Sequence, residues 1–288
     1  MAYSARVIRD SVSPSGDRLT TMEVTFPRIV LAEFNTHRAF SRNSASSRAI
    51  PVEKMLQRVK DDPFVPIYWG RNQRGMQAAE ELDPEARARA ERYWLEQRDH
   101  AVDVVMDLQR LDLHKQIANR LLEPFLWHTV IVTATDWSNF WGLRLGPEAQ
   151  PEIRRGADLM WSAMDASTPR QLGWGEWHLP LVDDEDDLRA AGYDQRGLIE
   201  VCVGRCARVS YLTHDGKRDP RADVELCRRL LSNGHMSPFE HAARPMQGDE
   251  RRPSLGLHSN LHGWVQARKL IVDEHDFSKA RPGRSIDI

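Results

Sequence analysis

The chain has 288 residues, of which 41% are hydrophobic and 28% charged, a composition that predicts a globular protein with a sizeable core. Its 40 basic and 42 acidic residues give a net charge of −2. This balance argues against a protein that coats polymeric nucleic acid, because such proteins carry a clear basic excess. An anionic partner is therefore expected to be small and to be held by local arginines.

The cysteine and histidine spacings predict neither a disulfide scaffold nor a metal site. Cys202, Cys206 and Cys227 are odd in number and lack dense spacing. His258 and His262 stand four residues apart, but no third ligand accompanies them. No apolar run approaches the roughly 20 residues of a membrane span, and the N-terminal MAYSARVIRDS has no apolar signal core. We therefore expect a cytoplasmic protein without a membrane partner.

The first part of the chain predicts a strand, a short helix and a polar loop. In residues 19–26 (LTTMEVTF), Met22, Val24 and Phe26 occupy alternate positions, which predicts a half-buried strand. The following PRIVLAEFNTHR predicts a short helix with proline in its first turn. Residues 41–51 (SRNSASSRAIP) are small and polar, and they predict a loop whose backbone N–H groups can approach a ligand closely.

Helices predominate in the middle of the chain. The tripeptide DPE at 83–85 combines a capping residue, a proline and an early acid, and it predicts a helix that runs to about residue 110. HKQIANRLLEPFLW predicts a second helix that ends near Pro124. VIVTAT at 130–135 predicts a strand or an extended connection, and a further helix is expected to begin at Pro151.

The last part of the chain predicts a linker and one more helix. Residues 165–195 hold proline, glycine, tryptophan and the acidic run DDEDD, which is typical of a solvated linker. A last helix is expected over 221–232, before Asn233-Gly234. The whole pattern predicts a mixed α+β fold.

One polar segment gathers groups that suit an anion. THRAFSRNSASSR, residues 36–48, holds an imidazole, three arginines, four serines and an asparagine within 13 residues. Guanidinium forks, hydroxyls and loop N–H groups suit a phosphate. The residues alone leave two interpretations open, an anion-binding loop and a solvated polar loop.

The same segment resembles the signature of the flavin-dependent thymidylate synthases, which reads Arg-His-Arg, seven residues, Ser. ANRLLEP resembles the family's helix that carries a nucleotide-binding arginine, here Arg120. FWGLRLGPEAQPEI and the residue just upstream resemble the family's Asn-x-x-x-x-Arg…Ala-Gln-x-Glu-Ile run. The matching positions are His37, Arg38, Asn43, Ser46 and Arg48 in the signature, and Asn139, Arg144, Ala149, Gln150, Glu152 and Ile153 in the later run.

Two further segments resemble the motifs that open the family's chain, but they stand in an unusual order. CARVS (206–210) and NGHMSPFEH (233–241) follow the signature by about 170 residues, whereas in the family they precede it. A compact domain with adjacent termini can be cut and rejoined without a change to its core. We interpret the order as a circular permutation of one domain, 1–288, with the signature loop and a helical part in 1–164, a linker in 165–197, and the counterpart of the family's N-terminal part in 198–288.

The resemblance implies a role for each matched residue. Arg144 would contact the pyrimidine ring and stabilise the charge that develops when carbon 5 becomes nucleophilic. The implied catalytic residues are Arg144 and Ser46. The implied nucleotide-binding residues are Ser46, Ser47, Arg48, Arg120, Arg144 and Glu33, and those implied to bind the flavin are His37, Arg38, Asn43, Asn139, Ser210, His235, Ser237 and Glu240.

Three positions depart from the family pattern. The first arginine of the signature is Thr36, the glutamate after its asparagine is Ser44, and a glutamine of the preceding helix is Glu33. A carboxylate near a phosphate is repelled unless an arginine neutralises it, so we expect a remodelled nucleotide pocket. Gln266 and Arg268 offer the lost amide and guanidinium.

The resemblance also implies a fold, an assembly and a reaction. The fold is expected to be α+β, a mostly antiparallel sheet flanked by long helices, assembled as a homotetramer with active sites shared between subunits. The implied reaction transfers a one-carbon unit from methylenetetrahydrofolate to carbon 5 of dUMP, with hydride from reduced FAD and with NADPH as the electron donor. The protein's own contribution to such chemistry is orientation and charge.

Several alternatives stay open. One is a flavin-dependent hydroxymethylase that acts on dUMP or dCMP, in which water meets the exocyclic methylene. dUMP ranks first, and Glu33 is the reason to keep dCMP second. The lost signature arginine and glutamate favour a non-catalytic nucleotide- or flavin-binding homologue. The unrelated cysteine-dependent thymidylate synthase needs an activated thiolate, and no cysteine here stands in its motif.

Overall fold

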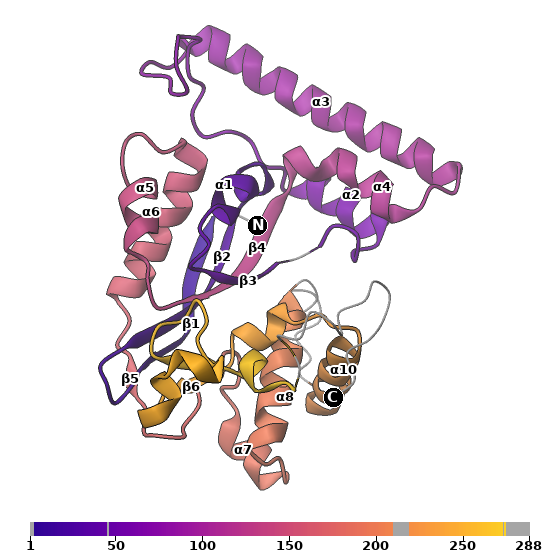
Figure 1. The fold of residues 1–288 in the computed structure, drawn as a ribbon. Helices are drawn as coiled ribbons and strands as arrows, with labels where there is room; N and C mark the ends of the chain where they lie inside the picture. Colours follow the sequence, from indigo (N-terminus) through magenta and orange to yellow (C-terminus); the bar gives the residue numbers. More distant parts are fainter. Residues whose placement is uncertain (1–2, 45, 210–218, 273, 275–288) are drawn as a thin grey trace.

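A five-stranded sheet forms the centre of the protein, as a computed structural model describes it for residues 3–44, 46–209, 219–272 and 274 (Figure 1). The strand order is β3-β4-β2-β1-β5, and every neighbouring pair is antiparallel except β1 and β5. The expected α+β class with a mostly antiparallel sheet is thereby confirmed. The strands are β1 (Ser4–Val12), β2 (Arg18–Pro27), β3 (Ser41–Ser44), β4 (Trp127–Ala134) and β5 (Arg170–Gln171).

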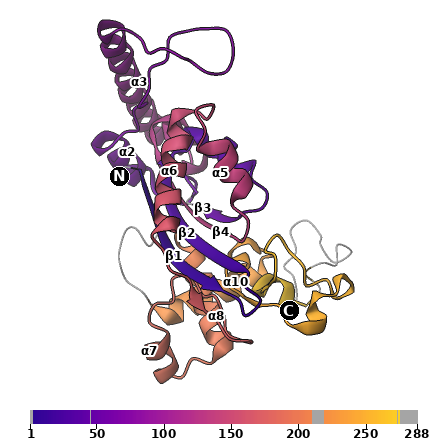
Figure 2. The ribbon, with the colours of Figure 1, turned by 90° about the vertical axis from the view of Figure 1, so that its left-hand side faces the viewer.

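One face of the sheet is apolar and carries two helices. Met22, Val24 and Phe26 of β2 are buried on this face. The helix α6 (Pro151–Asp165) packs on β1 and β2, and the shorter α5 (Ser138–Arg144) lies beside it (Figure 2). The alternation correctly marks the residues that face this helical layer, but β2 is not half-buried as expected, because Thr21 and Thr25 on its other face are buried too.

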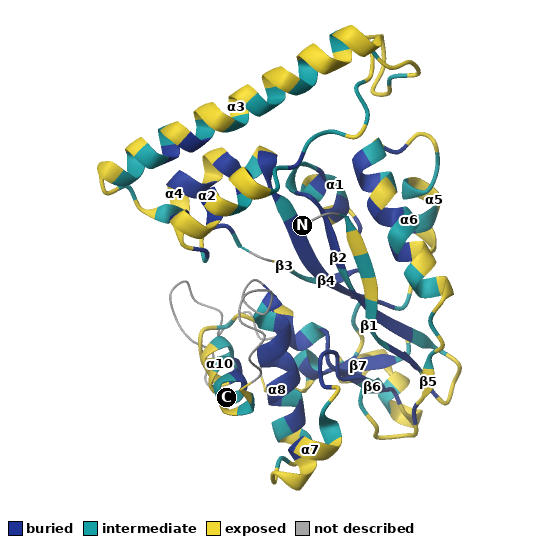
Figure 3. Ribbon diagram, turned by 180° about the vertical axis from the view of Figure 1, so that it is seen from behind, coloured by how far each residue is buried: buried dark blue, intermediate teal, exposed yellow. Residues whose placement is uncertain are grey.

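The other face carries hydroxyl groups and is covered by the C-terminal part of the chain. Thr21 of β2 and Thr133 of β4 share a hydrogen bond of 2.7 Å. The ring of His178 contacts Thr21 at 2.8 Å, and the ring of His241 contacts Thr133 at 2.8 Å. All four side chains are fully buried, so the described residues of 178–209 and 219–267 are fixed on the sheet by buried polar contacts as well as by apolar packing (Figure 3).

A third layer lies at one end of the sheet. It holds α2 (Val52–Asp61), α4 (Lys115–Ala118), the 3-10 helix η2 (Asn119–Phe125) and the long α3. The helix α3 (Pro84–Arg110) has 27 residues and crosses over this layer (Figure 1). Its N-cap is Asp83, whose side chain accepts a hydrogen bond from the backbone N–H of Ala86, as the DPE tripeptide predicts.

The remaining elements are short or belong to the C-terminal part. No helix among the described residues is long and apolar enough to cross a membrane. The short and C-terminal elements are η1 (Arg28–Val30), α1 (Leu31–Asn35), α7 (Glu185–Ala190), α8 (Gln195–Ala207), α10 (Pro220–Ser232), η3 (Ser237–Glu240), β6 (Ala243–Pro245), η4 (Gly248–Arg251), η5 (Pro253–Leu255), β7 (Trp264–Gln266) and η6 (Ala267–Leu270).

Two segments differ from the sequence-based expectation. Residues 41–44, expected as the start of a loop, form the edge strand β3, which pairs with β4. The interval 165–197, expected as a solvated linker, contains β5 and α7 and buries Leu179 and Leu181 in the core. Its acidic run is also engaged, because Asp184 forms an ion pair with the fully buried Arg205. The charges of the run therefore neutralise a buried cation, which composition alone does not reveal.

Candidate functional site

The implied ring-side arginine and the implied flavin-side histidine are in direct contact. Arg144, at the end of α5, donates a hydrogen bond from Nε to Nε2 of His37 at 2.9 Å. Its Nη2 contacts the backbone oxygen of Glu33 at 3.3 Å and Oγ1 of Thr36 at 3.4 Å. Two segments more than 100 residues apart in sequence thus meet at the end of α1.

His37 is held as a neutral hydrogen-bond acceptor. Its side chain is only 5% exposed and packs edge-on against the ring of Phe140, 4.9 Å between centroids. Burial and the positive charges of Arg144 and Arg42 lower the pKa of His37 to about 4, while a hydrogen bond with Asn139 acts in the opposite direction. The imidazole therefore orients Arg144 without adding a second positive charge at neutral pH.

The carboxylate of Glu33, a residue of α1 whose backbone oxygen contacts Arg144, is incompletely satisfied. Its Oε2 is buried and has no hydrogen-bond partner among the described residues. Thr36, which replaces the signature arginine, donates to the backbone oxygen of Glu33 at 2.7 Å. A buried acceptor without a donor is unfavourable, so a donor on a ligand would stabilise Glu33.

The signature loop is tied to the C-terminal part of the chain. Gln266 Nε2 contacts Ser41 Oγ at 3.0 Å, and Asn260 Nδ2 contacts the same hydroxyl at 3.0 Å. Asn43 Nδ2 reaches the backbone oxygen of Cys206 at 3.5 Å. Gln266 is 1% exposed, so its amide is used inside the protein. These bonds bring the two ends of the motif set together.

A chain of charges continues this link. Arg42 donates to the backbone oxygens of Phe34 and His37 at 3.3 and 3.1 Å, and it lies in the electrostatic field of Glu240. Glu240 is bonded by Arg268 Nη1 at 2.5 Å, and Arg268 also pairs with Glu274. Arg268 is therefore engaged by two carboxylates rather than by the signature loop.

Four further residues implied to bind the flavin lie at the surface, and one of them, Asn139, also forms a hydrogen bond with His37. Arg38, Asn139, His235 and Ser237 are exposed. Arg38 comes from the N-terminal signature, Asn139 from α5, and His235 and Ser237 from the C-terminal motif. Ser210 lies outside the described residues. Ser44, at the position of the missing glutamate, is exposed at the end of β3.

The implied phosphate-binding residues form a second group, centred on a carboxylate. Oε1 of Glu123 accepts from Ser47 Oγ at 2.7 Å, from Arg120 Nη1 at 2.7 Å and from Arg28 Nη2 at 3.3 Å. We call Glu123, Ser47, Arg120 and Arg28 the Glu123 hub. Ser46 is half-buried beside Ser47.

Arg48 and Arg144 both lie apart from the Glu123 hub. Arg48 is exposed, without a hydrogen bond or ion pair to any described residue. Nor does a hydrogen bond among the described residues connect Arg144 with the Glu123 hub. The implied nucleotide residues therefore fall into a ring-side group and a phosphate-side group.

The turn that carries Ser47 is fixed by the segment α4–η2. Asn119 is fully buried, and its Nδ2 donates to the backbone oxygens of Ser47 and Ile50 at 2.7 and 2.9 Å. Lys115 donates to the backbone oxygen of Ala49 at 3.2 Å. Lys115, Asn119 and Glu123 therefore all bond to the 46–50 turn, from α4 and from the 3-10 helix η2.

The three cysteines do not offer an activated thiolate. Cys202, Cys206 and Cys227 are buried and free. Burial raises the pKa of the Cys227 thiol to about 12, and a hydrogen bond with Cys202, followed by burial, raises the pKa of Cys206. A nucleophilic cysteine needs the opposite shift.

The resemblance assigned no role to three residues of these groups. Arg42 stands inside the signature segment, but only the fold places it between His37 and Glu240. Arg28 precedes the signature by eight residues, and Glu123 lies inside the matched ANRLLEP segment, but neither stands at a position to which the resemblance gives a role. Arg28 and Glu123 come together only in the folded protein, and sequence spacing does not predict this contact.

The mixed α+β fold thus brings Arg144 against His37 and groups a hydroxyl and two guanidiniums around Glu123. A family model described as thymidylate synthase complementing protein matches residues 13–170, more than half of the chain. The chain belongs to this family and is an enzyme of the thymidylate synthase-like type.

Comparisons with individual proteins give weaker similarity. Two solved structures of the UMP/dUMP methylase PolB from Streptomyces cacaoi, one bound with 5-Br UMP and one with 5-Br dUMP, share 16% and 15% identity with this chain. Each has a TM-score of 0.47 and covers 57% of this chain, with 89% and 90% of the respective PolB chain aligned. No curated protein sequence matches significantly. The matched family range ends before CARVS and NGHMSPFEH.

Proposed function

We propose that this protein transfers a one-carbon unit from methylenetetrahydrofolate to carbon 5 of a deoxypyrimidine monophosphate, with dUMP to dTMP as the first candidate reaction. The observation that carries the proposal is the 2.9 Å contact between Arg144 and His37. It joins the residue implied to face the pyrimidine with a residue implied to face the flavin, inside a chain of the family. The substrate ring and the cofactor would therefore meet at this contact.

Arg144 performs the electrostatic part of the reaction. When carbon 5 of the pyrimidine becomes nucleophilic, negative charge develops on the ring, and a fixed guanidinium stabilises it. The bond to neutral His37 and the contact with the backbone oxygen of Glu33 fix the guanidinium before the substrate binds. Ser46, Ser47, Arg48 and Arg120 would hold the phosphate and so orient the ring.

The side chains that are present fit a flavin dinucleotide. Exposed Arg38 suits its pyrophosphate, and the exposed groups of Asn139, His235 and Ser237 suit its polar ring and ribose edges. Bound FAD, once reduced by NADPH, would supply the hydride. The protein's part is to orient the two partners and to set the charge around them.

The packing of the C-terminal part supports a circular permutation. The bonds from Gln266 and Asn260 to Ser41, and from Asn43 to Cys206, set 198–209 and 260–266 against the signature segment. We propose that 1–288 forms one permuted domain, in which these contacts replace the chain connection of the family. We also propose that the protein assembles as a homotetramer with active sites shared between subunits, as the family resemblance implies.

A second candidate substrate is dCMP, and the observation that favours it is Glu33. Its buried Oε2 accepts hydrogen bonds only, and the 4-amino group of cytosine donates one, whereas the matching oxygen of uracil does not. The product of either nucleotide could then be the methyl or, with water in place of hydride, the hydroxymethyl derivative.

The mass of the product tests the proposed function. The protein is incubated with FAD, NADPH, methylenetetrahydrofolate and either dUMP or dCMP, and the masses of the nucleotides are measured by mass spectrometry. We expect dUMP to gain a methyl group. A hydroxymethyl product, or a product from dCMP alone, selects an alternative above. If neither nucleotide changes mass while the protein binds FAD and both nucleotides, the protein is a non-catalytic homologue.

A further inference from the structure

The Glu123 hub places the donors of an anion site around an internal anion. A hydroxyl and two guanidiniums, from Ser47, Arg28 and Arg120, converge on one oxygen of Glu123. These donors come from three separate segments, the 46–50 turn, η1 and η2. Hydroxyl and guanidinium donors around one oxygen atom are the arrangement that a phosphate oxygen prefers.

The hub is accessible, and its own side chains carry a net positive charge. The side chains of Arg28 and Glu123 are 19% and 21% exposed, and that of Arg120 is 46% exposed. Burial and the adjacent Arg28 guanidinium lower the pKa of His128 to about 3, so this ring stays neutral and does not add to the charge. Two guanidiniums against one carboxylate leave a net positive charge at the hub.

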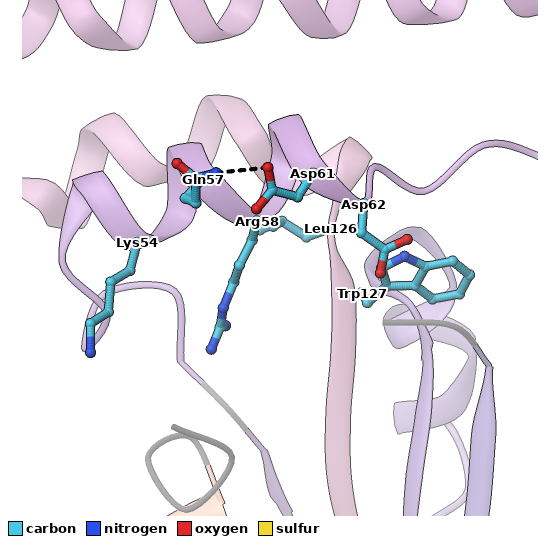
Figure 4. Close-up of a pocket in the computed structure, with 7 residues that line it drawn as sticks. All are labelled: Lys54, Gln57, Arg58, Asp61, Asp62, Leu126 and Trp127. Atoms are coloured by element: carbon cyan, nitrogen blue, oxygen red, sulfur yellow. Dashed lines mark hydrogen bonds between the residues drawn. The ribbon is translucent and has the colours of Figure 1, made fainter. Parts of the chain in front are cut away.

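A cavity lies directly beside the hub. Arg28 and Ser47 line a small hollow that shares Arg58 and Trp127 with a neighbouring cavity of about 380 Å³. Figure 4 shows that Lys54 and Arg58 extend from α2 along the same side of this cavity, with Trp127 on another side. A volume of this size falls within the range of small-molecule sites.

We propose that Glu123 is a positioning residue that occupies the place of the substrate phosphate in the free protein, and that Arg28 is a further phosphate ligand. This inference rests on the proposed function for the identity of the nucleotide. When the phosphate binds, Ser47, Arg28 and Arg120 transfer their hydrogen bonds from the carboxylate to phosphate oxygens. Glu123 keeps the three donors aligned beforehand, and its negative charge opposes the incoming dianion. The carboxylate therefore sets how tightly a phosphate monoester is held.

Binding measurements on Glu123→Gln test this proposal. Calorimetric titrations use the FAD-loaded protein with three probes, namely inorganic phosphate, dUMP and deoxyuridine. Glutamine keeps the acceptor oxygen and removes the charge, so the affinities for phosphate and for dUMP are expected to rise about tenfold, the equivalent of removing one like-charge repulsion. Deoxyuridine has no phosphate, and its affinity is expected to stay unchanged.

A second variant covers the case in which Glu123→Gln does not fold. Arg28→Gln removes a charged donor, and the affinities for phosphate and dUMP are expected to fall by roughly tenfold or more, again without an effect on deoxyuridine. The matched control is Glu185→Gln, which changes a carboxylate on α7 that is bonded by Arg189 and lies near Arg9. This control is expected to leave all three affinities at the wild-type value.

The proposal is overturned if the folded Glu123 variant binds phosphate and dUMP no more tightly than wild type, or if deoxyuridine changes in parallel. It is equally overturned if Arg28→Gln leaves both anion affinities unchanged. None of these titrations requires turnover. If the variants change phosphate affinity but no product forms at carbon 5, the role of the hub is supported and the proposed reaction is rejected. If product forms but the variants leave the affinities unchanged, the reaction is supported and the role of the hub is rejected.

Discussion

Arg144→Ala is expected to reduce turnover on the order of a hundredfold or more, with a much smaller effect on flavin affinity. Loss of a fixed donor at a developing negative charge typically raises the barrier by about 3 kcal/mol. Arg144 contacts His37 and the end of α1, but it is only half-buried, so the fold is expected to survive its removal. Steady-state kinetics should show a fall in kcat with little change in KM.

A second measurement on the Arg144→Ala variant is the pKa of His37. The positive charge of Arg144 is one cause of the lowered pKa of this imidazole, so in Arg144→Ala the pKa of His37 should rise from about 4. Proton NMR of the histidine ring gives this value. Arg155→Ala, an exposed arginine on α6, is the control and should change neither quantity. Wild-type turnover in Arg144→Ala would place the arginine away from the reacting ring.

Stability should fall steeply as the pH drops below 6.5, because four histidines are held neutral in the folded protein. Burial, with nearby positive charge for some of them, lowers the pKa values of His37, His128, His178 and His241. In the unfolded chain histidines titrate near 6.5. Below that pH the unfolded state binds protons that the folded state does not, so the free energy of unfolding decreases until the pH reaches the folded pKa values, about 4 for His37 and about 3 for His128 and His241.

Each such histidine contributes a slope of about 1.4 kcal/mol per pH unit, so the four together give on the order of 5 kcal/mol per unit. Urea unfolding curves between pH 7.5 and 5 measure this slope. His128→Gln should reduce the slope by about one proton equivalent, whereas the exposed His100→Gln should leave it unchanged. A free energy of unfolding that is constant from pH 6.5 to 5 would contradict the buried neutral state of these rings.

The fold was predictable from sequence where a local signal is strong. The helix α3 begins and ends as the DPE cap and the following pattern indicate, and β2 and β4 coincide with alternating or β-branched runs. The helix α8 was not predicted, because its residues are buried on nearly every side and so show no amphipathic period. The strand β1 was also not predicted, because a register irregularity between Val7 and Arg9 interrupts the alternation that marks a strand.

The candidate site was predictable in its residue types but not in its geometry. The signature supplied His37 and Ser47, and the later motifs supplied Arg144 and Arg120, because these residues stand in recognisable runs. The contact of Arg144 with His37 and the convergence on Glu123 depend on the packing of α1, α5 and η2 around the sheet. No sequence period specifies such long-range distances.

In the proposed permuted arrangement, residues from both ends of the chain form one flavin site. FAD affinity, measured by quenching of flavin fluorescence, tests it in Arg38→Ala and His235→Ala, which remove exposed side chains near the N- and C-terminal motifs. The controls are Arg89→Ala and His100→Ala on the exposed face of α3. We expect each site variant to weaken FAD binding by roughly tenfold, as for loss of one charged or strong hydrogen bond, and the controls to bind as wild type does. Wild-type affinity in His235→Ala together with a loss in Arg38→Ala would show that the C-terminal motif does not reach the flavin, and it would contradict the permuted arrangement.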